Sequence, residues 1–112
     1  MRRWIVATAL CVAGAGCASA MERTDGMDTS VVPEEQRADY ALFAQRCSKC
    51  HSLARPLNSG ITDDGYWHMY VEKMRRQPGS GITEADTAPI LRFLHWYSVD
   101  QLQRQQKGRD AG

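Results

Sequence analysis

The sequence predicts a small all-α domain built around one covalently bound group. Three segments (33–47, 63–77 and 83–103) repeat apolar residues at the spacing of a helix, and no segment alternates as a strand does. A Cys-x-x-Cys-His run at 47–51 begins where the first of these segments ends. Such a run is the attachment signature of a c-type haem, in which two thiols bond to the porphyrin and the histidine ligates iron. We therefore expect about three helices packed around one haem c.

The spacing of this run gives each of its three functional residues a role. On one turn of helix, positions i, i+3 and i+4 share a face. Cys47, Cys50 and His51 are therefore expected to point toward one edge of the porphyrin. The two cysteines would form the covalent bonds, and His51 would be the proximal ligand of the iron. We also expect the second ring nitrogen of His51 to bond a backbone carbonyl in 55–57.

Three other interpretations of the run stay open. A thioredoxin-like redox pair is typically found beside a βαβ pattern, which this sequence lacks. A zinc site would need two further ligands, which only His68 and His95 can supply. A plain disulfide between Cys47 and Cys50 is the structural alternative in an oxidising compartment. We favour haem attachment because the run is its specific signature.

Residues 1–20 have the pattern of an export signal. Two arginines near the start precede an apolar stretch that is too short to span a bilayer as a stable helix. Ala18-Ser19-Ala20 then forms an A-x-A cleavage site. We expect cleavage after this site, which leaves only Cys47 and Cys50 in the mature chain.

Cys17 offers an alternative to this cleavage. The run Ala15-Gly16-Cys17 is similar to the end of a bacterial lipoprotein box, in which the cysteine becomes the acylated first residue. Acylation would tether the chain to the membrane through a lipid anchor. We favour cleavage after Ala20 because Gly14 stands three residues before Cys17, where such boxes usually carry Leu.

The charge of the mature chain argues against two classes of partner. The whole chain has 14 Lys and Arg against 13 Asp and Glu. Loss of Arg2 and Arg3 with the signal leaves twelve basic side chains and a formal charge of −1, to which two haem propionates would add. A nearly neutral surface argues against nucleic acid or an anionic membrane as a partner. No segment is expected to span a membrane.

The first helix is expected to follow a flexible leader at 21–32, which is polar and lacks periodicity. Pro33 suits the first helical position, and the two glutamates after it place negative charge at the positive end of the helix dipole. Tyr40, Phe43 and Cys47 lie in one stripe when each residue advances the helix by 100°. The face that carries the haem therefore also carries two aromatic rings.

The second helix is expected from Asp63 or Asp64, either of which can cap it, to about Gln77. Before it, 52–63 is predicted to be loop, because a proline, an asparagine and a glycine interrupt it. After it, a Pro-Gly-Ser-Gly run stops the helix.

The faces of this second helix separate two methionines. Its apolar stripe consists of Trp67, Tyr70, Val71 and Met74. Met69 falls far round the helix from that stripe. A soft thioether on the core side suits the vacant axial position of the iron, so Met74 is the expected distal ligand. The alternatives are Met69, His68, His95 or an empty position.

The third helix opens with Thr83-Glu84-Ala85-Asp86, which is close to a capping box. Pro89 opposes an unbroken helix, so we expect either a kink there or a start near Thr87. The helix should continue to about Gln103, and the polar tail at 104–112 should fray. Its core stripe consists of Ile90, Phe93, Leu94 and Tyr97.

The order of helix, Cys-x-x-Cys-His, loop, Met and C-terminal helix resembles the bacterial class I cytochromes c. The likeness covers roughly 33–97, and Phe43 stands where that family has the aromatic residue that packs on the terminal helix. The stretch 67–94 is also similar to short monohaem domains that serve periplasmic dehydrogenases. Two departures are Asp39 and Ser52, which stand where the family often has glycine. The resemblance implies a small cytochrome c fold over 33–103 and maturation in the periplasm.

The function that this resemblance implies is electron transfer by a protein that is not itself an enzyme. Its partners would be a redox protein donor and a redox protein acceptor, and the basic residues at 73–76 would steer an acidic partner. One alternative is a five-coordinate haem protein that binds a small gas or reduces peroxide, with Met74 as ordinary core. Another is a tethered subunit that relays electrons within a complex.

Overall fold

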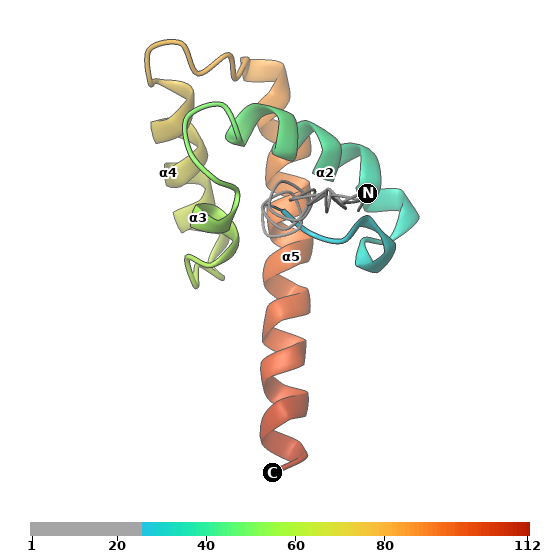
Figure 1. Ribbon diagram of the computed structural model, residues 1–112. Coiled ribbons are helices and arrows are strands. Elements are labelled where there is room, and N and C mark those ends of the chain that lie inside the picture. Colours follow the sequence, from blue (N-terminus) through green and yellow to red (C-terminus); the bar gives the residue numbers. More distant parts are fainter. Residues whose placement is uncertain (1–25) are drawn as a thin grey trace, which may run out of the picture.

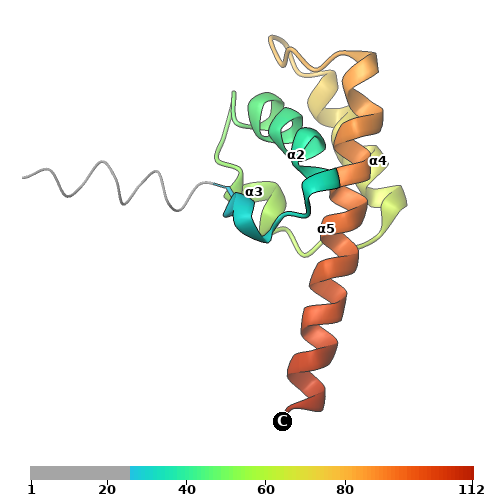
Figure 2. The same ribbon diagram turned by 90° about the vertical axis from the view of Figure 1, so that its right-hand side faces the viewer.

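Helix α5 is the element against which the rest of the described chain packs. The computed structural model describes residues 26–112, which contain four α-helices, one 3₁₀ turn and no strand. In chain order these elements are η1 (Thr29–Val31), α2 (Glu34–Cys47), α3 (Ala54–Leu57), α4 (Asp64–Arg75) and α5 (Glu84–Asp110). Helices α2 and α4 pack against the first half of α5, whose second half projects beyond them (Figures 1 and 2). The predicted all-α class is confirmed for this part of the chain.

Helix α2 lies across α5 through an aromatic contact. It begins directly after Pro33 and ends at Cys47, as predicted. Tyr40 and Phe43 are buried, and the ring centroids of Phe43 and Phe93 are 4.8 Å apart. Stacked or tilted rings at this separation bury large apolar areas, so this contact forms the centre of the core.

A bidentate ion pair also joins α2 to α5. Arg92 Nε and Nη2 donate to the two carboxylate oxygens of Asp39 at 2.9 and 3.0 Å. Asp39 is one of the two positions where we noted a departure from glycine. The helix crossing is therefore held here by a charged pair at its edge.

Helix α4 presents the face that its apolar stripe predicts. The Asp63 carboxylate caps its start by accepting from the Tyr66 N–H at 3.0 Å. Trp67 and Val71 are buried, whereas the side chain of Met69 is 67% exposed. The Trp67 indole N–H donates to the Ser98 hydroxyl of α5 at 2.7 Å. The opposite orientation of Met69 and the core stripe is thus confirmed.

Helix α5 begins at its capping box. The Thr83 hydroxyl accepts from the Asp86 N–H at 3.2 Å, and the Asp86 carboxylate accepts from the Thr83 N–H at 2.9 Å. These bonds and the nearby Arg46 guanidinium lower the pKa of the Asp86 carboxyl. The alternative start near Thr87 is therefore wrong, and the helix runs through Pro89. The capping box satisfies the first turn of α5. Pro89 lies beyond that turn and costs the helix one backbone hydrogen bond, because proline has no N–H to donate.

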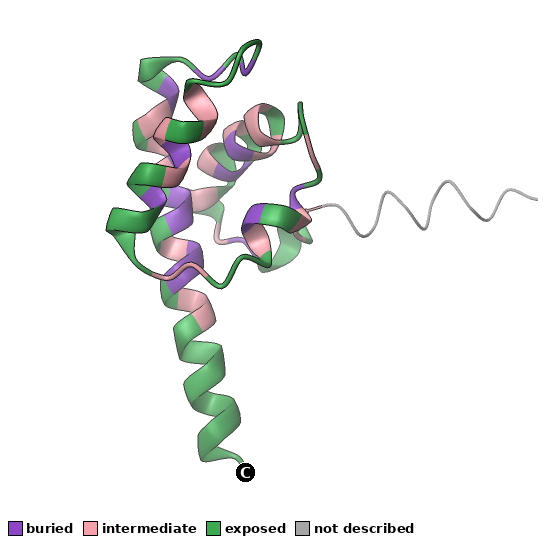
Figure 3. Ribbon diagram, turned by 90° about the vertical axis from the view of Figure 1, so that its left-hand side faces the viewer, coloured by how far each residue is buried: buried purple, intermediate pink, exposed green. Residues whose placement is uncertain are grey.

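The far end of α5 is longer than predicted. The helix continues to Asp110 instead of ending near Gln103, and this projecting part is exposed on its surface (Figure 3). Its residues are mostly straight-chain polar types with good helix propensity. Arg104 also pairs with Asp100 at 2.7 Å, one turn earlier on the helix. The prediction of an end near Gln103 was wrong because it followed the apolar stripe. Helix propensity and the Arg104–Asp100 ion pair stabilise the helix beyond the point where that stripe stops.

Two segments predicted as irregular take part in the fold. Residues 54–57 form α3, although 52–63 was expected to be loop. Pro56 is tolerated because it lies in the first turn, where a backbone N–H has no intrahelical partner. At the end of the predicted leader, Val32 is 1% exposed, and residues 29–31 form η1. The end of the predicted leader thus contains a short 3₁₀ turn and an apolar residue that packs against the core just before α2.

The export signal predicted at 1–20, the alternative lipid site at Cys17 and the leader residues 21–25 lie outside the described residues. Within 26–112, no helix has the length and apolar character needed to cross a bilayer. The expectations of export and of a lipid anchor thus stay predictions.

Candidate functional site

A cleft of about 440 Å³ lies between the C-terminal ends of α2 and α4. The Cys-x-x-Cys-His run borders it on one side, and Met74 of α4 and the loop between α4 and α5 border it on another. Its volume is within the range of sites that hold small molecules and cofactors. Four residues singled out from the sequence therefore line one cleft: Cys47, Cys50, His51 and Met74.

The Cys-x-x-Cys-His run reaches the cleft by a turn and not by a continued helix. Helix α2 ends at Cys47, and the N–H of Ser48 closes it by donating to the Ala44 carbonyl at 3.2 Å. The expectation that Cys50 and His51 lie on the same helical turn is therefore wrong. The turn nevertheless brings all three side chains to the cleft, because a compact turn keeps residues three and four apart close together.

The ring of His51 bonds a different carbonyl from the one expected. Its Nδ1 lies 3.1 Å from the carbonyl oxygen of Ser52, so the expected partner in 55–57 is wrong. Two carbonyls there already have partners: Pro56 O accepts from the Ser59 hydroxyl at 2.7 Å, and Leu57 O accepts from the Tyr97 hydroxyl at 2.6 Å. With a proton on Nδ1, the lone pair of His51 Nε2 stays available to a metal.

The two cysteines differ in exposure and are not joined to each other. Cys47 is half-buried at the end of α2, whereas Cys50 is exposed. Burial raises the pKa of the Cys47 thiol to about 11. A redox-active Cys-x-x-Cys pair depends on a lowered thiol pKa. The environment of Cys47 therefore disfavours the thioredoxin-like interpretation.

The zinc interpretation lacks its ligands. His68 and His95 line a separate groove of about 780 Å³, away from the two cysteines. The ring of His95 is held there by Asp64, whose carboxylate oxygens lie 3.0 Å from Nδ1. Nowhere in 26–112 do three His, Cys, Asp or Glu side chains gather in a way that could hold a metal ion. These positions also remove His68 and His95 as partners of the Cys-x-x-Cys-His run.

The wall behind Met74 is apolar. Met74 is half-buried and lines both the cleft and a small void that Phe43, Val71, Ile90 and Leu94 enclose. Its thioether therefore stands between the hydrophobic core and the cleft. A soft, polarizable sulfur in such a place is suited either to core packing or to ligation of a soft metal centre.

The polar side chains of the cleft are cationic or neutral. Arg46, Arg55 and Lys73 line it, and no carboxylate does. Arg46 forms an ion pair with Asp86 at 2.9 Å, whereas none of the ion pairs found in the described chain includes Arg55 or Lys73. The cleft therefore favours a ligand with negative charge.

The hydroxyl of Tyr70 is an orphan beside these cations. It is buried in the wall of the cleft and has no hydrogen-bond partner among residues 26–112. Burial raises the pKa of this phenol, and the charge of Arg55 partly opposes the rise. A buried polar atom without a partner is costly, so a ligand that accepts a hydrogen bond here would be stabilised.

Comparisons with known proteins give no assignment for this chain. No family model, no curated protein and no solved structure matches it. The residues of the cleft are therefore what indicates a function for this chain. Sequence reasoning identified four of them but missed Arg55, placed Tyr70 in the core stripe only, and gave Ser80 no role beyond ending a helix.

Proposed function

We propose that this protein is an electron carrier with one c-type haem, bonded to Cys47 and Cys50 and ligated by His51 and Met74. When bound, the haem supplies a one-electron couple between Fe(II) and Fe(III). The observation that carries the proposal is the convergence of these four residues on one cleft, although Met74 is more than twenty residues away in sequence. Other residues of the cleft would orient the two iron ligands and contact the propionates and the porphyrin face.

Different parts of the chain position the two expected iron ligands, His51 and Met74. The Ser52 carbonyl lies 3.1 Å from His51 Nδ1, and a proton on Nδ1 would orient the ring and leave the Nε2 lone pair for the iron. The last turn of α4 directs the Met74 thioether to the cleft from the apolar side. Together with the porphyrin nitrogens, His51 and Met74 would fill the coordination positions of the iron, and a thioether would favour the reduced state. Such a ligand pair is typical of electron carriers, which need no open coordination position.

The remaining polar groups of the cleft fit the carboxylates that a haem carries. Arg55 and Lys73 are cationic and lack ion-pair partners in the described chain, and the Tyr70 hydroxyl is buried without a hydrogen bond. Charge-assisted hydrogen bonds from these donors would neutralise propionates. The apolar wall at Phe43 and Leu94 would exclude water from the porphyrin face.

The proposal extends to fold type, compartment and partners. We infer that 33–103 forms a small cytochrome c domain, that 1–20 directs it to the periplasm, and that donor and acceptor are redox proteins. The carrier would serve a periplasmic oxidoreductase or a respiratory chain, to which this donor or acceptor belongs. Acylation of Cys17 in place of cleavage after Ala20 would make the same domain a tethered relay within a complex.

The test of this proposal is haem attachment during export from a host that matures c-type cytochromes. The wild-type protein should keep its haem through acid-acetone extraction, since thioether bonds survive it. The double variant Cys47→Ala, Cys50→Ala should lose the haem completely, whereas Ser48→Ala in the same turn should keep it. Extraction of all haem from the wild-type protein would refute the proposal.

A further inference from the structure

The helix end that carries Met74 is fully hydrogen-bonded. Helix α4 ends at Arg75, and the last four carbonyls of a helix have no intrahelical partner. Each of them is satisfied here by a group from the next five residues. The four bonds are Arg76 N–H to Glu72 O at 3.1 Å, Gln77 Nε2 to Lys73 O at 3.1 Å, Gln77 N–H to Met74 O at 3.1 Å and Ser80 Oγ to Arg75 O at 2.9 Å.

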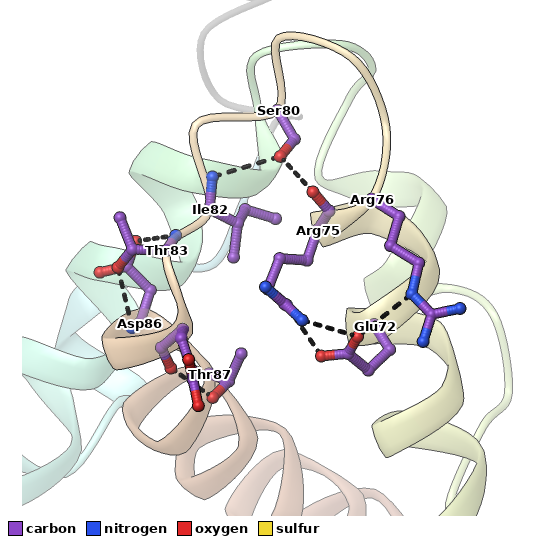
Figure 4. Close-up of polar contacts among 9 residues, drawn as sticks. Glu72, Arg75, Arg76, Ser80, Ile82, Thr83, Asp86 and Thr87 are labelled. Carbon is purple, nitrogen blue, oxygen red and sulfur yellow. Dashed lines mark hydrogen bonds and ion pairs between the residues drawn. The ribbon is translucent and has the colours of Figure 1, made fainter.

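Ser80 is the buried residue among those that close the end of α4. It is 8% exposed and lines the cleft, whereas the Gln77 side chain lies on the surface. Its hydroxyl donates to the Arg75 carbonyl and accepts from the Ile82 N–H at 3.3 Å, as Figure 4 shows. Its own N–H donates to the Gln77 carbonyl at 3.1 Å. One hydroxyl thus ties the end of α4 to the segment that leads into α5.

The segment that Ser80 holds forms part of the apolar wall behind Met74. Ile82 is buried and borders the same small void as Met74, Ile90 and Leu94. The two glycines beside Ser80 have positive φ angles of 75° and 69°, which let the chain turn back sharply toward α5. The position of Met74 and the position of Ile82 are therefore coupled through Ser80.

The same loop touches the other side of the cleft. A Cβ atom at Gly81 would lie 2.7 Å from Nζ of Lys49, so the Lys49 side chain rests directly on this glycine. Lys49 belongs to the Cys-x-x-Cys-His run. The loop fixed by Ser80 thus lies between the two segments that supply the expected iron ligands.

We propose that Ser80 is the positioning residue for Met74, and that its hydroxyl keeps the thioether directed into the cleft. This inference rests on the proposed function, in which Met74 ligates iron. Loss of the hydroxyl leaves the partly buried Arg75 carbonyl and the buried Ile82 N–H without the bonds that Ser80 gives them. The loop then opens to hydrate them, and the last turn of α4, which carries Met74, loses one of its four closing bonds and its link to Ile82. Ser80 touches neither iron nor substrate in this role.

The experiment compares four haem-loaded full-length proteins: wild type, Ser80→Ala, Ser80→Thr and Ser59→Ala. Ser59 is a matched control, since its hydroxyl also donates to a carbonyl, Pro56 O at 2.7 Å, and accepts from an N–H two residues on, Ile61 at 3.2 Å. It makes these bonds in the loop before α4, far in sequence from Met74. Ser80→Thr keeps the hydroxyl and serves as the rescue.

The readouts are the weak sulfur-to-iron absorption band of the oxidised protein and carbon monoxide binding by the reduced protein. In Ser80→Ala the fraction of molecules with Met74 displaced should rise about tenfold, the effect of losing two hydrogen bonds of modest net strength. Carbon monoxide binding should accelerate by the same factor. Ser80→Thr and Ser59→Ala should match the wild type in both readouts.

The outcomes separate this inference from the function on which it rests. If Met74→Ala abolishes the band but Ser80→Ala leaves the band and the carbon monoxide rate unchanged, Ser80 is only structural and the inference is wrong. If the wild type holds haem covalently without a sulfur band, ligation by Met74 fails and the inference fails with it. Should Ser80→Ala yield no folded protein, Ser80→Cys, which keeps the size but donates weakly, must show a graded loss of the band.

Discussion

Two of the hollows in the described part of the chain differ less in size than in how their charges are paired. The groove that His68 and His95 line, at about 780 Å³, is larger than the cleft at about 440 Å³. Its charged groups are satisfied: Asp64 holds His95 at 3.0 Å, and Arg92 holds Asp39 through two bonds. The cleft instead combines unpaired cations with a buried phenol that has no partner in the described chain.

This difference teaches where to look for a ligand. In the groove the charged groups already pair with one another, and the buried polar atom without a partner there, Gln36 Oε1, is a neutral acceptor, so an anionic ligand would gain little. A cleft with an orphan donor and unbalanced charge gains a hydrogen bond and a charge neutralisation when an anionic group enters. The smaller hollow is therefore the better candidate site, and each of the following experiments probes one side of the contrast.

The largest expected effect comes from Met74→Ala. If Met74 ligates a haem iron as proposed, removal of the thioether should erase the sulfur-to-iron band, lower the midpoint potential and open the iron to carbon monoxide. Absorbance spectra and a redox titration measure all three. Met69→Ala is the matched control: its side chain is 67% exposed on the opposite face of α4, so none of the three should change.

The result for Met69→Ala also tests which face of α4 is turned toward the cleft. If Met69→Ala removes the band, α4 is rotated relative to the cleft in the folded, haem-loaded protein. If wild-type reduced protein binds carbon monoxide rapidly, the iron has an open position, and the alternative of a gas-binding or peroxide-reducing protein gains support.

A smaller effect is expected from the cations of the cleft. Arg55→Gln or Lys73→Gln should slow oxidation of the reduced protein by ferricyanide several-fold at low ionic strength, because each cation attracts an anionic reactant. A cationic cobalt complex should react faster with the same variants. Stopped-flow measurements over a range of salt concentrations should show both differences vanish as screening increases.

Arg92→Gln provides the matched control for this charge effect. It removes one positive charge, like the cleft variants, but from the groove, where Arg92 is paired with Asp39. Its rates with both reagents should stay close to those of the wild type. Equal slowing by Arg92→Gln and Arg55→Gln would mean that net charge, and not the cleft, governs the reaction.

Sequence reasoning succeeded where a residue's place depends on a regular helix. The opposite orientations of Met74 and Met69 follow from 100° per residue along α4, and the structure has both as predicted. The start of α2 after Pro33 likewise follows from local chemistry that acts within one turn. Such features need no knowledge of the rest of the fold.

It failed where a residue's role depends on partners that only the fold brings near. The Tyr70 hydroxyl is an orphan because of what surrounds it in the cleft, which no periodicity encodes. Ser80 gains its role from a loop that folds back on the end of α4. The carbonyl of Leu57 accepts from Tyr97, forty residues later, whereas His51 Nδ1 lies beside the carbonyl of Ser52. Contacts between segments far apart in the sequence are therefore the part of a site that sequence patterns predict least.

The smallest effect is expected from His95→Gln, the groove's counterpart to the cleft variants. His95 and Asp64 are both more than half exposed, and an exposed pair contributes about 0.2–1 kcal/mol at most. The free energy of unfolding should therefore change by less than about 1 kcal/mol in urea titrations. The haem spectrum and midpoint potential should stay at the wild-type values, because His95 is neither a ligand nor a lining residue of the cleft. A shifted potential or an altered spectrum would place this histidine in contact with the prosthetic group, and the contrast between groove and cleft would then be lost.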